Sequence, residues 1–327
     1  MKCLGIECTA HTFGMSVVDD QGKIFSNVRD TFMTEKGGMN PSEVAEHHRN
    51  VKDTILEKSL KEAQTSLSEI HLIAVSSAPG LAPCLLVGMH CAKDLARSLG
   101  IPLVGVNHCV AHLEIGLLMS QAKDPIFVFS SGANTQVIAY EGGKYRIFGE
   151  ALSVGLGNAL DKFGRALGLG FPAGPQIEKL AKKGNYLELP YVVKGMDVEF
   201  SGIVTHVIDK FKKGASQEDL SYSLQETGFA MLTEVTERAL AHTNKKEVLL
   251  IGGVGANKRL CSMMDMMCKE RGAVFYSCPL QYVGDNAAMI AWNGLLKFKA
   301  EGIDEIKILD IDDSQRTDTV HLTWKSI

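Results

Sequence analysis

The chain shows one order of strands and helices twice, and this repetition constrains its fold more than any other feature of the sequence. Short apolar runs bounded by turn residues indicate strands, and apolar residues at helical spacing indicate helices. In the first half this pattern predicts strands at residues 2–7, 13–18, 71–76 and 103–106, and helices at 41–67 and 88–99. In the second half it predicts strands at 126–130, 135–140, 144–148, 248–251 and 273–276, helices at 217–242, 257–271 and 286–299, and a helical region after residue 157.

Strands that alternate with helices favour an α/β fold, in which mixed sheets carry helices on both faces. We therefore expect two lobes, residues 1–122 and residues 123–327, with the helical region inserted in the second lobe. A cleft between two such lobes is the default place for a ligand. The length of 327 residues and the hydrophobic content of 45% are sufficient for two large cores.

Composition and charge exclude several classes of protein. The sequence contains no run of eighteen apolar residues and no export signal, so we expect a cytoplasmic protein without a membrane segment. Its eight cysteines lack a C-x-x-C pair and fit reduced thiols. The net charge of −4 argues against a generally basic nucleic-acid binder. Local basic runs remain at residues 182–183, 210–213 and 245–246, although such runs are more often ordinary solvated surface.

Two glycine-containing loops follow predicted strands, one in each half. Residues 131–135 read Ser-Gly-Ala-Asn-Thr, and residues 252–257 read Gly-Gly-Val-Gly-Ala-Asn. Such loops offer backbone N–H groups to phosphate oxygens, and either loop alone can equally be a tight turn. Their occurrence in both halves favours a phosphate site. A P-loop is excluded because no G-x-x-x-x-G-K-[ST] motif occurs.

His108 and His112 lie four residues apart at the start of an expected helix, so both imidazoles project from one face. Asp285, at the mouth of another expected helix, is the best third ligand. The alternatives are a pair of hydrogen-bonded histidines and an ordinary helix cap. Two histidines and one carboxylate suit Fe²⁺, with Zn²⁺ as the alternative. A metalloprotease is disfavoured because Cys109 occupies the position of the glutamate in H-E-x-x-H.

A set of segments distributed along nearly the whole chain has the pattern of one enzyme family. These segments are residues 5–7, 40–41, 47–48, 78–88, 106–112, 131–136, 161–162, 171–175, 200–202, 252–254, 285–291 and 315–318. With them the chain resembles the tRNA N6-adenosine threonylcarbamoyltransferases of the archaeal and eukaryotic branch, whose member is the catalytic subunit of the KEOPS complex. The resemblance implies the duplicated fold of actin, sugar kinases and chaperone ATPases.

The resemblance also implies the residues of the site. His108, His112 and Asp285 match the family's metal ligands and are the expected catalytic residues. The expected site for an adenine nucleotide, either threonylcarbamoyl-AMP or ATP, comprises Phe129, Ser130, Ser131, Gly132, Ala133, Asp161, Gly174, Glu178 and Asn257. Carboxylates at two of these positions can accept hydrogen bonds from hydroxyl groups, although they could instead lie on a solvated helix face.

Two positions depart from the family pattern. Archaeal relatives place an additional metal-binding tyrosine where this chain has Phe129, and a phenyl ring cannot coordinate a metal. The usual Gly-Gly before proline is Ala173-Gly174 here, a change that is tolerated if residue 173 does not need a positive φ.

The implied activity is transfer of a threonylcarbamoyl group from threonylcarbamoyl-AMP to N6 of the adenine that follows the anticodon of a tRNA. The implied partners are tRNA and the KEOPS companion subunits, among them a small atypical protein kinase and a dimerising subunit. No general base stands out, and His11 and His47 are only guesses. The alternatives are an actin-like ATP-binding switch with a structural metal and a sugar or acetate kinase. The histidine pair speaks against a switch, because hydrated Mg²⁺ prefers oxygen ligands.

Overall fold

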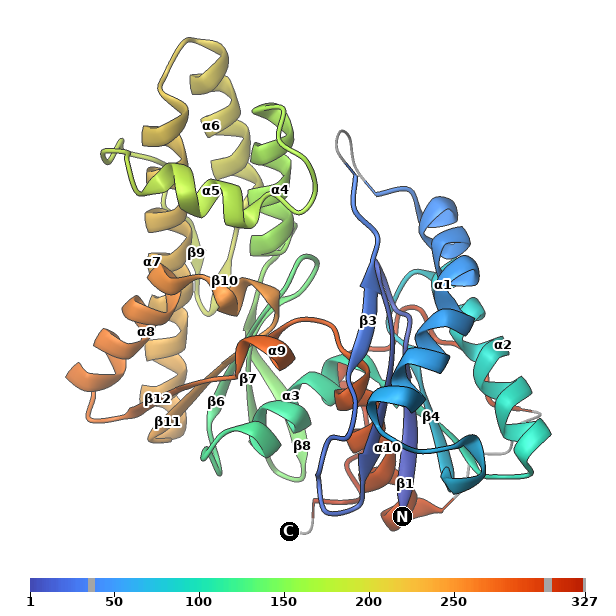
Figure 1. The fold of residues 1–327 in the computed structure, drawn as a ribbon. Helices are drawn as coiled ribbons and strands as arrows, with labels where there is room; N and C mark the ends of the chain where they lie inside the picture. Colours follow the sequence, from blue (N-terminus) through green and yellow to red (C-terminus); the bar gives the residue numbers. More distant parts are fainter. Residues whose placement is uncertain (35–38, 303–307, 326–327) are drawn as a thin grey trace.

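The computed structural model describes residues 1–34, 39–302 and 308–325, which form two lobes that each contain a five-stranded sheet (Figure 1). The first sheet has the order β3-β2-β1-β4-β5, and the second has the order β8-β7-β6-β11-β12. In each sheet the first three strands are antiparallel and the last two add in parallel. The predicted duplication is therefore confirmed at the level of topology.

Apart from β3, for which no bounds were predicted, the strands of both sheets lie close to their predicted positions. Their bounds are β1 Lys2–Glu7, β2 Thr12–Asp19, β3 Val28–Thr31, β4 Leu72–Ala78, β5 Leu103–Asn107, β6 Ile126–Ser130, β7 Thr135–Glu141, β8 Lys144–Glu150, β11 Glu247–Ile251 and β12 Val274–Ser277. The central strands β1, β4 and β6 are buried on both faces, as their continuous apolar sequences require.

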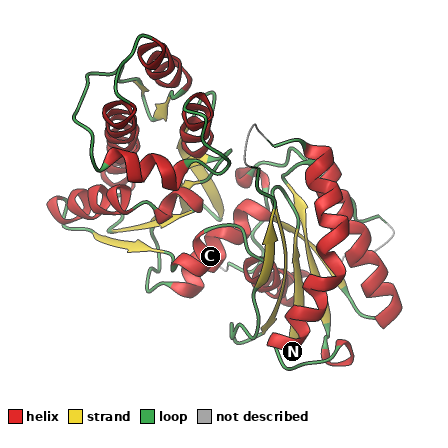
Figure 2. Ribbon diagram, turned by 45° about the horizontal axis from the view of Figure 1, so that its top comes forward, coloured by secondary structure: helices red, strands yellow, loops and turns green. Residues whose placement is uncertain are grey.

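The helices flank the sheets (Figure 2). Their bounds are α1 Pro41–Glu62, α2 Ala82–Leu99, α3 His108–Met119, α4 Leu156–Ala166, α5 Gly174–Ala181, α6 Ser201–Lys212, α7 Gln217–Thr243, α8 Lys258–Glu270, α9 Leu280–Val283 and α10 Ala287–Glu301. Helices α4, α5 and α6, with the small hairpin of β9 (Val193–Lys194) and β10 (Asp197–Val198), form the predicted insertion in the second lobe (Figure 1). No described helix is long and apolar enough to span a membrane.

Two helix boundaries differ from the prediction. The first helix was expected to continue to residue 67 but ends at Glu62, because Gln64 takes a left-handed φ of 48° and a capping box of Ser66 and Glu69 then begins a separate short turn. The second helix was expected from residue 88 but begins at Ala82. Pro83 is compatible with this earlier start because the first turn of a helix does not need its N–H group.

The last helix of each half packs on elements of the other half. Helix α10, from the second half of the sequence, packs on β1, β2 and β4 of the first sheet. A Cβ atom on Gly5 would lie 2.4 Å from the carbonyl oxygen of Ala287, so glycine is required for this close approach. Helix α3, from the first half, packs on α10 and on β11 of the second sheet. It lies between the two lobes (Figure 1).

Candidate functional site

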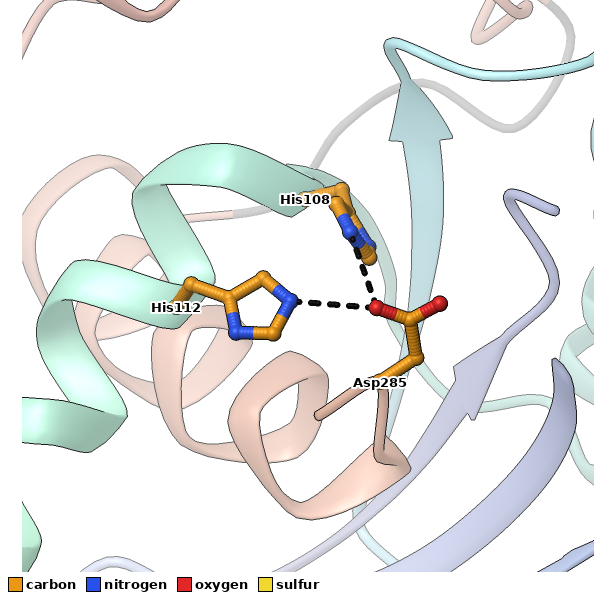
Figure 3. A group of neighbouring side chains, drawn as sticks. All are labelled: His108, His112 and Asp285. Carbon is orange, nitrogen blue, oxygen red and sulfur yellow. Dashed lines mark hydrogen bonds and ion pairs between the residues drawn. The ribbon is translucent and has the colours of Figure 1, made fainter. Parts of the chain in front are cut away.

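The N-termini of α3 and α10 meet at the junction of the lobes and present three predicted residues to one another (Figure 3). Asn107 caps α3, with its Oδ1 accepting a hydrogen bond from the backbone N–H of Val110 at 3.1 Å, so the helix begins at His108. Asn286 caps α10 in the same way, with its Oδ1 accepting from Met289 N, so Asp285 lies immediately before that helix. Two capped helix ends therefore fix the backbones of His108, His112 and Asp285.

The three side chains converge on one point. Nε2 of His112 lies 3.3 Å and Nε2 of His108 lies 3.5 Å from the same carboxylate oxygen, Oδ1 of Asp285 (Figure 3). The three donor atoms lie within 4.8 Å of one another. Ligands on one tetrahedral ion at bond lengths of about 2.0–2.1 Å would be roughly 3.3–3.4 Å apart. The donor set and its spacing therefore fit a single divalent ion.

A buried carboxylate that the sequence analysis did not assign a role orients His108. Oε2 of Glu7 lies 3.0 Å from Nδ1 of His108, and the other oxygen of Glu7 accepts hydrogen bonds from the N–H group and the hydroxyl of Thr9. Carboxylate–histidine pairs of this kind turn the opposite ring nitrogen toward a metal. The available signal was a glutamate at the end of an otherwise apolar strand, since Glu7 is fully buried in β1.

The charges of this cluster shift its pKa values in opposite directions. Burial lowers the pKa of His108, but the charge and hydrogen bond of Glu7 outweigh this and raise it to about 9. Burial lowers the pKa of His112. Burial of Asp285 favours its neutral form, but the hydrogen bond from His112 and the charge of His108 hold the pKa of Asp285 well below its usual range. The cluster therefore favours an ionised Asp285.

Phe129 forms an apolar wall beside His112. Its buried ring has its centroid 5.1 Å from that of the His112 imidazole, at an interplanar angle of 37°. Nδ1 of His112 is buried and has no hydrogen-bond partner among the described residues. Neighbouring Ser130 is also fully buried. The structure thus places Phe129 beside the cluster of His108, His112 and Asp285.

A cavity of about 240 Å³ opens in the second lobe next to this cluster. Its lining includes five of the predicted nucleotide residues: Gly132, Asp161, Gly174, Glu178 and Asn257. The other lining residues are His11, Gly157, Leu160, Phe171, Pro172, Pro175, Gly253, Val254 and Ala256. Ser131 and Ala133 are not part of this lining, although both belong to the same turn as Gly132.

The two glycine-containing loops both contribute to this pocket. The turn of residues 131–134 closes through a 2.7 Å bond from Ser131 N to Asn134 O, and it packs against the first turn of α4. A Cβ atom on Gly157 would lie 2.5 Å from Ser131 O, so this contact requires glycine. Gly253, Val254 and Ala256 of the second loop also line the pocket. The two loops that together favoured a phosphate site in the sequence therefore line the same pocket in the structure.

Three polar residues of the pocket also hold neighbouring backbone. Asp161 accepts a 2.7 Å hydrogen bond from Ala173 N, and burial raises its pKa. Glu178 accepts from Lys258 N at 3.1 Å. Oδ1 of Asn257 caps α8 by accepting from two backbone N–H groups, and its Nδ2 donates to Gln225. The amide oxygen of Asn257 is thus engaged in the helix cap, which the sequence analysis did not foresee.

The two histidines considered as a general base lie in different environments. His11 lines the pocket, and its Nδ1 lies 3.8 Å from Oδ2 of Asp285. His47, on α1, lies 3.0 Å from Oδ1 of Asp30 and does not line the pocket. The geometry therefore favours His11 over His47.

Comparisons with known proteins agree with the family resemblance. The family model described as TsaD, tRNA N6-adenosine threonylcarbamoyltransferase, matches residues 23–292. The enzyme of this name from Thermococcus sibiricus is 50% identical over 326 residues, which is 99% of this chain and 100% of the relative. A protein of Methanothermobacter thermautotrophicus, named as a probable bifunctional tRNA threonylcarbamoyladenosine biosynthesis protein, is 49% identical over 99% of this chain and 61% of its own length.

Solved structures match the fold at low sequence identity. HypF of T. kodakarensis superposes with a TM-score of 0.61 at 15% identity, covering 92% of this chain and 48% of that chain. The activator of the 2-hydroxyisocaproyl-CoA dehydratase from Clostridium difficile gives a TM-score of 0.55 at 12% identity, over 91% and 96% of the two chains. These neighbours confirm the actin-like ATPase fold. The family model and the half-identical relatives go further, and by them the chain belongs to the tRNA N6-adenosine threonylcarbamoyltransferase family.

Proposed function

We propose that the protein transfers the threonylcarbamoyl group of threonylcarbamoyl-AMP to N6 of the adenine that follows the tRNA anticodon. The observation that carries this proposal is the position of the His108, His112 and Asp285 cluster beside a pocket lined by the predicted nucleotide residues. In the reaction, the adenine N6 forms a bond with the carbamoyl carbon. The bond from that carbon to the phosphate oxygen breaks, a proton leaves N6, and AMP departs.

The metal ligands we propose are His108, His112 and Asp285, with Fe²⁺ as the first choice and Zn²⁺ as the second. A divalent ion bound there would polarise an oxygen of the donor and stabilise the charge that develops on it. Glu7 would keep Nε2 of His108 turned toward the ion through the hydrogen bond to Nδ1. Phe129 adds no ligand atom, so open coordination positions remain for the substrate.

The pocket would hold the AMP part of the donor. Asp161 and Glu178 can accept hydrogen bonds from ribose hydroxyls, while the two glycine-containing loops offer N–H groups to the phosphate. These N–H groups would also stabilise the negative charge that AMP carries away. The names of the relatives favour this transferase over the alternative of an ATP-binding switch.

One of the three basic runs suits a tRNA backbone better than the others. Lys245 is largely buried between Asp124 and Glu141, and Lys213 pairs with Asp209. Residues 182–183, by contrast, are exposed lysines that form no ion pair among the described residues. They directly follow α5, the helix whose Gly174 and Glu178 line the pocket. We propose that residues 182–183 contact tRNA phosphates and that KEOPS companion subunits supply further affinity.

The proposal is tested by incubating the purified protein with threonylcarbamoyl-AMP and unmodified tRNA, alone and with the companion subunits. Nucleoside mass spectrometry should detect N6-threonylcarbamoyladenosine, and AMP should be released in equal amount. Nucleotide hydrolysis without modified tRNA under both conditions would instead favour the ATP-binding switch.

A further inference from the structure

The segment of residues 309–325, which we name the strap, crosses from the first lobe to the second. At its start, Leu309 and Ile311 pack against the core of the first lobe. Asp312 N donates a 2.9 Å hydrogen bond to Ser77 O at the end of β4, and Gly80 N donates to Asp313 O. The strap is therefore attached by both side chains and backbone to the first lobe.

The middle of the strap contacts the cap of the helix that carries the two histidines. Nδ2 of Asn107 donates a 2.9 Å hydrogen bond to Oε1 of Gln315, a residue 208 positions further along the chain. The other end of the same amide, Oδ1 of Asn107, accepts from Val110 N. Because both ends of the amide are hydrogen-bonded, its plane is fixed, and with it the backbone that leads into His108.

The end of the strap is attached to the second lobe and to the middle of α3. Arg316 forms an ion pair with Glu150 of β8 at 3.1 Å. Further on, Nε1 of Trp324 donates to Oε1 of Glu114 at 3.2 Å, and Nζ of Lys325 lies 3.4 Å from the same oxygen. Glu114 is only 4% exposed and lies two residues after His112. Its buried charge is thus compensated jointly by these two strap residues and by the hydroxyl of Tyr145 of β8, which donates to Oε1 at 2.8 Å.

We infer that the strap positions α3, and that Gln315 is a positioning residue for His108 and His112. Helix α3 needs such support because it packs between two lobes and belongs wholly to neither sheet. The strap contacts α3 at two places, at the cap residue Asn107 and at Glu114 in the second turn. These contacts lie close in sequence to His108 and His112, and no strap residue lines the pocket. Loss of these contacts would increase the mobility of α3 and of the two imidazoles that it carries. The catalytic part of this inference rests on the proposed function, whereas the structural part does not.

The test compares three substitutions in the full chain, prepared without metal. Gln315→Met keeps the length of the side chain and removes the acceptor, while Gln315→Glu keeps an acceptor oxygen. Ser314→Ala is the matched control, since within the described part of the chain Ser314 hydrogen-bonds only to Asp312 in its own turn. Hydrogen exchange of peptides that cover residues 108–113 should become about fivefold faster in Gln315→Met and stay near the wild-type rate in the other two.

The same variants, now loaded with Fe²⁺, are then assayed for transfer. Gln315→Met should lower kcat about fivefold at an unchanged KM for tRNA, and Gln315→Glu should restore it. If Gln315→Met does not fold, Gln315→Asn gives the same test, because its amide is one methylene too short to reach Asn107. Wild-type exchange rates in a folded variant that lacks the hydrogen bond would overturn the inference. If the wild-type protein itself shows no transfer activity, faster exchange in Gln315→Met would still uphold the role of the strap and would count against the proposed function alone.

Discussion

Nδ1 of His11 lies 3.8 Å from Oδ2 of Asp285, and the His11 side chain also lines the nucleotide pocket. The imidazole of His11 is therefore placed between the metal-ligand cluster and the bound donor that we propose. In the complex that we propose, a group at this position would be close to the carbonyl that the adenine attacks. We therefore expect His11 to act on the reacting atoms more than on binding.

The substitution His11→Asn should lower kcat about a hundredfold, a typical effect for a group that transfers or orients a proton. Binding of AMP, measured by calorimetry, should change little because the carboxylates and loops of the pocket remain. A parallel His47→Asn variant serves as a control, since His47 does not line the pocket. Equal losses of activity in both variants would contradict the role of His11.

The substitution His108→Ala should abolish transfer and lower the bound metal, measured by elemental analysis, without altering the circular dichroism spectrum. The reason is that one of two imidazole ligands is lost while the Asn107 cap of α3 remains. Cys109→Ala is the adjacent control, because burial raises the pKa of this thiol to about 12 and makes it a poor ligand. Full activity in His108→Ala would refute the metal assignment.

The substitution Phe129→Tyr should increase metal retention during dialysis against a chelator. The phenyl ring already contacts the His112 imidazole, so a hydroxyl on it would add an oxygen donor at the edge of the ligand cluster. Retention is measured as metal per protein after dialysis, with Phe127→Tyr on the same strand as the control. Unchanged retention would show that the tyrosine oxygen does not reach the ion.

Charge reversal of Lys182 and Lys183 together should raise KM for tRNA about tenfold and leave the affinity for AMP unchanged. The slope of log affinity against log salt should fall by about one to two, as expected when two phosphate contacts are lost. The matched control is charge reversal of Lys210 and Lys212 in α6, a helix that does not line the pocket. If the control pair weakens tRNA binding equally, the effect reflects net charge and not a contact.

Acid should destabilise the fold through His48. Burial of this fully enclosed residue against Phe13 lowers its pKa to about 4, whereas the unfolded chain binds the proton near pH 6.5. The unfolded state therefore holds more protons between these values, and up to about 3 kcal/mol of stability is lost as the pH falls from 6.5 to 4. Urea unfolding at several pH values should show a smaller loss in His48→Met than in the wild type. Parallel losses in the two proteins would exclude His48 as the cause.

Periodicity, turn residues and helix caps in the sequence were sufficient to predict most of the strands and helices. The duplicated strand order and the common helix face of His108 and His112 follow from periodicity and helical spacing. Asp285, 173 positions after His112, was chosen from its place at a helix mouth and from the family resemblance. The packing of α10 on the first sheet could not be predicted from these local patterns. An apolar helix face in the sequence does not specify which of the two sheets it will pack on.

The unpredicted contacts join residues that are distant in the sequence. Glu7 and His108 are 101 positions apart, and Asn257 and Gln225, whose side chains are hydrogen-bonded, are 32 positions apart. In each case the sequence defined a polar group but not its partner. Only the tertiary packing of strands and helices determines these pairs.

The position of α10 on the first sheet has a consequence for motion. Asp285 and the two histidines are held by the α3–α10 contact, whereas almost all walls of the nucleotide pocket come from the second lobe. A rotation of one lobe against the other would therefore carry the donor toward or away from an intact set of ligands. Such a hinge motion would change the distance between the proposed ion and the nucleotide, and so control when the reaction can occur, while the three ligands keep their positions relative to one another.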